Sequence, residues 1–121
     1  NIKMKWQPIS ESEIMNEINS SCERMSPDQK QFWEAIKTTP NKWRENKYGK
    51  EVESFWVVAI IGNTIVWYND IEEEFNHSKY HNYGEIDDDW CYQNELEWVI
   101  QNIIDEIKRG YDPAINSIPL F

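Results

Sequence analysis

The sequence predicts an α+β fold, in which a small antiparallel sheet built on a central hairpin packs against two N-terminal helices and one C-terminal helix. Three observations carry this prediction. Two capping boxes open the chain, two strand-like runs flank Gly62-Asn63, and an apolar stripe at helical spacing follows Gln93. The chain has 121 residues, enough for one domain around a single core, and no linker or repeat divides it.

Capping boxes predict where the two N-terminal helices begin. Ser10-Glu11-Ser12-Glu13 places a glutamate three residues after a serine, so that each side chain satisfies a free backbone N–H. The apolar residues that follow lie at helical spacing and form one face: Ile14, Ile18, Cys22 and Met25. Ser26-Pro27-Asp28-Gln29 repeats the pattern and predicts a second helix to about Thr38, which Pro40 ends.

The segment after Pro40 combines basic and aromatic residues. We expect Asn41 to Lys50 to form an exposed loop, and its cations with those just before it are Lys37, Lys42, Arg44, Lys47 and Lys50. Trp43 and Tyr48 lie among them, a pattern found in nucleic-acid binders. Because the net charge of −10 repels phosphate, we expect these cations to be solvated or paired with acids of the same chain.

The central hairpin is the strongest structural signal in the chain. Val52 to Ile61 and Thr64 to Asn69 are rich in β-branched and aromatic residues, and Gly62-Asn63 suits a two-residue turn. This turn predicts a register in which Ile61 faces Thr64, Ala59 faces Val66, Val57 faces Tyr68 and Val58 faces Trp67. Both faces of the hairpin are largely apolar, so we expect both to be covered.

The rest of the chain predicts a short strand, a helix and a tail. Tyr83 to Asp87 favours a third strand beside the hairpin. Apolar residues at helical spacing predict a helix from about Gln93 to Arg109, and Gly110 suits its end. We expect residues 111–121 to form a tail. Asn1 to Lys3 are assigned no function, because Met4 is a plausible native start.

Acidic residues are concentrated in one half of the chain. Between Asp70 and Glu106, twelve acids and one lysine give a formal charge of −11. Aromatic residues share this stretch, and the combination favours binding of a basic protein while opposing nucleic acid and anionic membranes. The acids and the tryptophan that we expect to contact such a partner are Asp70, Glu72, Glu73, Glu74, Asp87, Asp88, Asp89 and Trp90.

Metal-binding and catalytic interpretations have weaker support. Glu73, His77 and His81 are spaced four apart and would share one face of a helix, which suits zinc, but a full metalloprotease motif is missing. Asp87-Asp88-Asp89 lacks the alternating ligands and the glycine of a calcium loop. Glu72 to Glu74 are consecutive, whereas the carboxylates of glycosidases face each other across a cleft. We therefore expect no enzymatic activity, no metal and no cofactor.

Membrane and secretion signals are missing from the sequence as given. The longest strongly apolar run, Phe55 to Ile61, is too short to span a bilayer, and no signal-peptide pattern opens the chain. We expect a cytoplasmic protein in which the two cysteines, Cys22 and Cys91, are reduced thiols. The sequence leaves the oligomeric state open.

Several segments resemble a known family. Phe55 to Asn76 contains Trp67-Tyr68-Asn69-Asp70-Ile71-Glu72-Glu73, and Tyr83-Gly84-Glu85-Ile86 and Gln93-x-Glu95-Leu96 follow it. With these motifs, the stretch from Ser54 to Ile104 resembles small bacterial immunity proteins of contact-dependent growth inhibition and polymorphic toxin systems. The resemblance implies that the protein binds a cognate toxin domain, often a nuclease with a basic groove, and blocks it.

Two other functions are left open by the sequence. One is a small metal-dependent hydrolase that uses Glu73, His77 and His81. The other is an acidic adaptor or DNA-mimic protein that binds many basic surfaces. Selectivity separates the second from an immunity protein, because an adaptor binds several unrelated basic proteins and an immunity protein essentially one.

Overall fold

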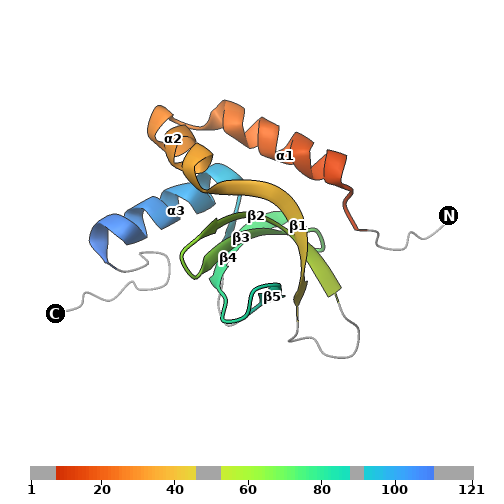
Figure 1. Ribbon diagram of the computed structural model, residues 1–121. Helices are drawn as coiled ribbons and strands as arrows, with labels where there is room; N and C mark the ends of the chain where they lie inside the picture. The colour runs from red at the N-terminus through yellow and green to blue at the C-terminus, as the bar shows by residue number, and fades with distance from the viewer. Residues whose placement is uncertain (1–7, 46–52, 88–91, 111–121) are drawn as a thin grey trace.

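The computed structural model describes residues 8–45, 53–87 and 92–110 and has an α+β fold (Figure 1). In this part of the chain the helices are α1 (Glu11–Arg24), α2 (Pro27–Ile36) and α3 (Leu96–Arg109). The strands are β1 (Lys37–Glu45), β2 (Glu53–Ile61), β3 (Thr64–Asn69), β4 (Glu74–Lys79), β5 (Glu85–Ile86) and β6 (Tyr92–Asn94). They form one mixed sheet in the order β5-β1-β2-β3-β4-β6, and the helices lie on one face of it. The predicted fold class is confirmed.

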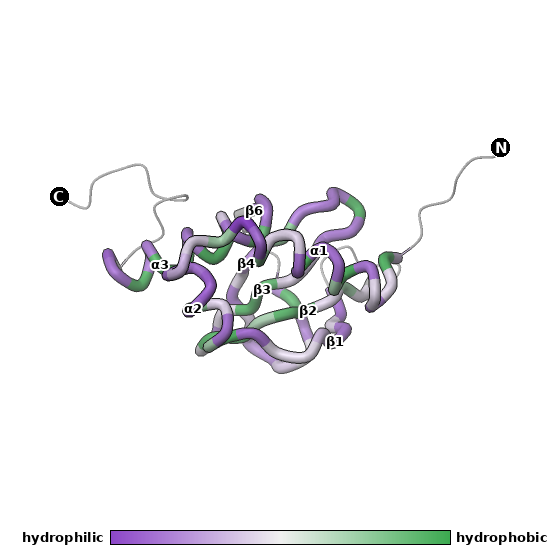
Figure 2. Tube along the Cα trace, turned by 90° about the horizontal axis from the view of Figure 1, so that it is seen from above, coloured by the Kyte–Doolittle hydropathy of each residue, from purple (hydrophilic) through white to green (hydrophobic). Residues whose placement is uncertain are grey.

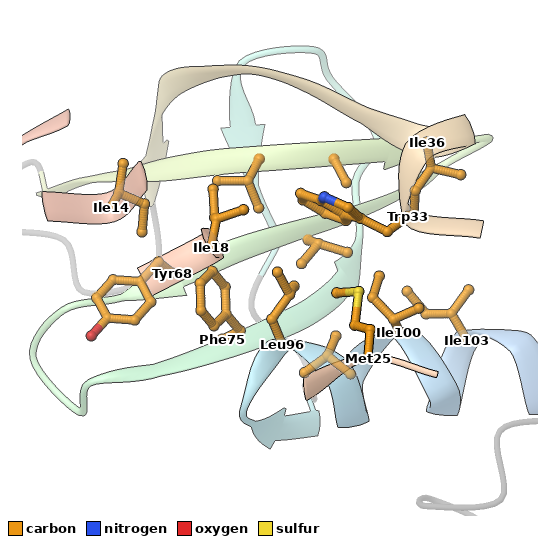
Figure 3. Packing of buried hydrophobic residues seen from close by; sticks show 14 residues of the cluster. Ile14, Ile18, Met25, Trp33, Ile36, Tyr68, Phe75, Leu96, Ile100 and Ile103 are labelled. Atoms are coloured by element: carbon orange, nitrogen blue, oxygen red, sulfur yellow. The ribbon is translucent and has the colours of Figure 1, made fainter. Parts of the chain in front are cut away.

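The main core lies between the helices and the sheet. Each helix contributes an apolar stripe, and Figure 3 shows Ile18 of α1, Trp33 of α2 and Leu96 of α3 meeting side chains of the sheet. From the sheet come Val58, Ala59, Val66, Tyr68 and Phe75. Figure 2, seen from above, shows the hydrophobic segments of β2 and β3 at the centre of the molecule. Burial of these stripes is the main force that holds the helices on the sheet.

A second apolar cluster covers the opposite face of the sheet. Its buried members come from four strands and are Trp43, Phe55, Val57, Ile65, Trp67 and Ile86. Tyr80 packs against the cluster and meets Trp43 edge to face, with 5.1 Å between ring centroids. The prediction that both faces of the hairpin are covered is therefore confirmed.

Both capping boxes form as predicted. The Ser10 hydroxyl accepts from the Glu13 N–H at 3.2 Å, and the Glu13 carboxylate accepts from the Ser10 N–H at 2.9 Å. Ser26 and Gln29 make the same reciprocal pair at the start of α2. The C-terminal helix ends at Arg109 with Gly110 in the left-handed region, as predicted, but it begins at Leu96 because residues 92–94 pair as β6.

The region from Lys37 to Glu45 was expected to end the second helix and begin a loop, and this was wrong. It forms β1, which pairs antiparallel with β2 and buries Trp43 and Glu45. Pairing with β2 and burial of Trp43 outweigh the local loop signals. Pro40 is tolerated because the register shifts between Lys37 and Asn41, where the missing N–H of proline leaves no ladder bond unmade.

The predicted hairpin is present, but half of its predicted register is wrong. Ile61 faces Thr64 and Ala59 faces Val66 as expected, whereas Val57 faces Trp67 and Trp56 faces Tyr68. The register shifts between Val57 and Ala59, and the extra residue of this bulge is Val58. As a result, Val58 and Ala59 both contact the helix-side core and Val57 the opposite cluster. Because of the bulge, residues that pair beyond it lie on the same face: Val57 pairs with Trp67, and both belong to the second cluster.

The remaining strands differ from the prediction in number and place. The strand next to β3 is β4, a segment for which no strand was predicted. The short strand predicted within Tyr83–Asp87 forms as β5, but it pairs parallel with β1 at the far edge of the sheet and not beside the hairpin. The sheet is therefore larger than predicted, and mixed.

One ion pair ties α1 to α3. Arg24 Nε donates to Glu97 Oε2 at 2.6 Å and Nη2 donates to Glu97 Oε1 at 3.2 Å, while Nη2 also donates to the Ser21 hydroxyl. The Glu97 side chain is only 6% exposed, against 48% for Arg24. Burial, the largest single cause, raises the pKa of Glu97, but the hydrogen bonds from Arg24, the backbone and Ser21, with the charge of Arg24, together outweigh it and hold this pKa below its ordinary value.

Candidate functional site

The loop between β3 and β4 is held in one conformation by its own backbone and by Asn69. The Asn69 side chain accepts from the N–H groups of Ile71 and Glu72 at 3.0 and 3.1 Å, and its carbonyl accepts from the Glu73 N–H at 2.6 Å. Glu73 has a φ of 63°, which is uncommon for a residue other than glycine. These bonds fix how the acids of the loop are presented.

The start of α1 docks directly on this loop. The Ile9 N–H donates to Asp70 Oδ2 at 2.8 Å, and the Ile9 carbonyl accepts from Trp56 Nε1 at 2.9 Å. The capping box then begins the helix at the next residue, so the first two turns of α1 run beside the β3–β4 loop. Glu13 and Glu17, four residues apart on the helix, therefore face Asp70 and Glu73 across a gap.

That gap is an open cleft of about 460 Å³, which we call the acidic cleft. The described residues that line it are Pro8, Ile9, Glu13, Asn16, Glu17, Tyr68, Asp70 and Glu73. Four of these eight carry carboxyl groups, and none is a lysine or arginine. Hydrogen bonds from Ser10 lower the pKa of Glu13, so this carboxyl is ionised at neutral pH. The cleft is thus a concentrated negative site built from two separate elements.

Tyr68 is the aromatic residue of the cleft. Its side chain belongs to the main core, is 5% exposed, and packs on Phe75 with 4.8 Å between ring centroids. Figure 3 shows its hydroxyl pointing away from the core. Burial, followed by the charges of Glu17, Glu73 and Asp70, raises the pKa of Tyr68 to about 12. The phenol is therefore neutral at physiological pH, and its hydroxyl remains a hydrogen-bond donor and acceptor.

The structure brings only part of the predicted contact set together. Asp70 and Glu73 line the cleft, although Asp70 is 9% exposed and was expected to be exposed. Its burial follows from the hydrogen bond with Ile9 that seats α1 on the loop. Glu72 is exposed on the same loop but does not line the cleft, and Glu74 is half-buried as the first residue of β4.

The other predicted contacts lie elsewhere or outside the described residues. Asp87 follows β5 at the far edge of the sheet, where its Oδ2 lies 2.5 Å from His81 Nδ1. Asp88, Asp89 and Trp90 lie outside the described residues. Sequence reasoning missed Glu13, Glu17 and Tyr68. The spacing of Glu13 and Glu17 put both on one helix face, but no local signal indicated which loop that face would meet.

The arrangement proposed for a metal does not form. Glu74–Lys79 is a strand and not a helix, so Glu73, His77 and His81 share no helical face. His77 is buried and its Nε2 lies 2.7 Å from Asn102 Oδ1, whereas His81 is exposed beside Asp87. Among the described residues, no group of three His, Cys, Asp or Glu side chains could hold a metal ion.

The basic segment and the cysteines are described only in part. Lys37 pairs with Glu34 at 2.8 Å, and the Lys42 ammonium lies 4.9 Å from the centre of the Trp56 ring. Lys47, Tyr48 and Lys50 lie outside the described residues. Cys22 is a free, half-buried cysteine on the stripe of α1, and Cys91 lies outside the described residues. None of the described helices is both long enough and apolar enough to cross a membrane.

Comparison with models of known protein families, with curated proteins and with solved structures gave no match.

Proposed function

We propose that this protein is an immunity protein, which binds a cognate toxin domain and neutralises it through the acidic cleft. The observation that carries the proposal is the convergence of Glu17, Asp70 and Glu73 on Tyr68, in a cleft that Glu13 also lines. Glu13, Glu17 and Glu73 meet no cationic side chain among the described lining residues, which favours a cation supplied by another molecule.

The overall charge supports a basic protein as that molecule. A net charge of −10 on 121 residues attracts cationic surfaces over several ångströms and speeds their association. The same field repels nucleic acid and anionic lipid. A nuclease toxin has a basic groove that binds phosphates, so an acidic partner competes with its substrate. Because such a toxin acts inside the cell, the proposed place of action is the cytoplasm.

The rigidity of the cleft supports specific binding. Glu13 is held by the capping box, Asp70 by the Ile9 N–H, and the loop by Asn69. Charges fixed in this way lose little conformational entropy when a partner binds, so more of the interaction energy appears as affinity.

The test uses the toxin domain encoded beside the gene, produced with and without this protein. We expect the wild-type protein to protect cells and to bind the domain, and we expect Glu17→Lys/Glu73→Lys to lose protection and to associate more slowly. Glu23→Lys/Glu72→Lys is the matched control, because it makes the same change in net charge, one on α1 and one on the β3–β4 loop, at exposed residues that do not line the cleft. Loss of binding by the control to the same extent would assign the effect to net charge and not to the cleft.

Selectivity separates the proposal from the two other functions. An immunity protein binds the cognate domain and leaves unrelated basic nucleases active, whereas an adaptor or DNA mimic binds several of them. A stoichiometric metal together with a hydrolytic activity in the purified protein would contradict the proposal outright.

A further inference from the structure

The Tyr68 hydroxyl is a polar group without a partner at the base of the acidic cleft. The residue as a whole is 5% exposed and lines the cleft, and among the described residues none bonds to its hydroxyl. The hydroxyl is not among the buried side-chain atoms that lack a partner, so it reaches solvent in the cleft, where an incoming group can replace water. A neutral phenol that points outward between carboxylates therefore provides a hydrogen-bond site for an incoming group.

The surroundings of this hydroxyl define the chemistry of that group. Glu17 on α1 and Glu73 on the β3–β4 loop both act on it electrostatically, from two different elements. A group that satisfies the site must carry positive charge and must donate several hydrogen bonds in different directions. A bare metal ion does not fit, because among the described residues no group of three His, Cys, Asp or Glu side chains could hold one.

A guanidinium group meets these requirements best. It carries a delocalised charge and five N–H donors in one plane, so it can bond to acids on two sides and to a hydroxyl between them. A lysine ammonium places three donors at one point and is more strongly hydrated. The open cleft of about 460 Å³ also has room for the long side chain of arginine.

We infer that the acidic cleft receives one arginine side chain of the partner, with the Tyr68 hydroxyl accepting from the guanidinium and the acids of α1 and the loop flanking it. This inference rests on the proposed function, because it names the chemical group of the toxin domain that the cleft recognises. A contribution of Tyr68 to binding would therefore show that the cleft recognises the guanidinium group by a hydrogen bond as well as by its charge.

The experiment titrates the protein with N-acetylarginine amide and follows the NMR signals of Tyr68 and of the β3–β4 loop. We expect saturable shifts there, weaker binding of N-acetyllysine amide, and no binding of the uncharged citrulline analogue. Tyr68→Phe, which retains the ring, should weaken binding about tenfold, as expected for one hydrogen bond to a charged group. Glu23→Gln is the control and should bind as the wild type does.

Three results would overturn the inference: equal binding of the arginine and citrulline probes, lysine binding as tightly as arginine, or unchanged affinity in a folded Tyr68→Phe variant. Should Tyr68→Phe disturb the fold, Glu17→Gln/Glu73→Gln provides a second test on surface residues, and unchanged arginine binding there would also overturn it. These failures are distinct from failure of the proposed function. A protein that neutralises its toxin equally well with Phe at position 68 keeps the function and loses the arginine site.

Discussion

Carboxylates play opposite roles in two regions of this molecule. Glu97 is buried between α1 and α3, and its two oxygens accept from Arg24 of the same chain. Glu17 and Glu73 face the acidic cleft, whose described lining includes no basic residue. The first arrangement compensates a charge and thereby stabilises the fold. The second leaves like charges near one another, which costs stability and creates the capacity to bind a cation.

The largest effect is expected where the charge is compensated. Glu97→Ala removes the acceptor of both Arg24 bonds and leaves space between the helices, so unfolding free energy should fall by about 2 kcal/mol. Urea denaturation measures this change. Glu23→Ala, an exposed acid one residue from Arg24, should have little effect. Equal stability of the Glu97→Ala variant and the wild type would mean that the ion pair merely balances its own desolvation.

The contribution of Glu97 to stability should depend on pH. Burial raises the pKa of Glu97, but the hydrogen bonds from Arg24, the backbone and Ser21, with the charge of Arg24, together hold it below its ordinary value of 4.5 in the folded state. Its carboxylate therefore stabilises the fold above pH 4.5, and this contribution is lost as the pH falls through the lower, folded-state pKa. Chemical denaturation between pH 3 and 7, a range of about four pH units around that step, should show a steeper acid loss for wild type than for Glu97→Gln. Parallel curves would contradict the assignment.

Features set by neighbouring residues could be predicted from the sequence, and features set by distant ones could not. Capping boxes, apolar stripes and the Gly62-Asn63 turn act over a few residues, and these predictions were confirmed. Strand β1 was missed because it is specified by its partner β2 and by burial of Trp43, which no local pattern reports. The bulge at Val58 was missed for a related reason: it depends on which face each neighbouring strand presents.

The residues of the cleft were likewise predictable only where the signal lay within one segment of the chain. Asp70 and Glu73 were predicted from acids that follow a strand, a signal contained in one segment. Glu13 and Glu17 are distant in sequence, and they join the site because the Ile9 N–H bonds to Asp70. A contact between residues 61 positions apart is set by the packing of α1 on the sheet, so helix periodicity alone could not supply it.

The smallest expected effect is a change in the pKa of Tyr68 in the cleft. Burial and the charges of Glu17, Glu73 and Asp70 raise the pKa of Tyr68 to about 12. In Glu17→Gln/Glu73→Gln the buried ring and Asp70 remain, so this pKa should fall but stay above its ordinary value of 10. An NMR titration of the Tyr68 ring measures it, with Glu23→Gln as the control that should change nothing.

The sign of this shift is also a test of how the cleft acts on a ligand. A field that disfavours the phenolate favours a cation at the same place, because both effects arise from the same carboxylates. The double variant should therefore lower the Tyr68 pKa and weaken arginine binding together, while leaving unfolding free energy unchanged or slightly higher, in contrast to Glu97→Ala. An unchanged Tyr68 pKa would mean that Glu17 and Glu73 do not act on the hydroxyl. The cleft would then not be the concentrated negative site that distinguishes it from the Arg24–Glu97 pair.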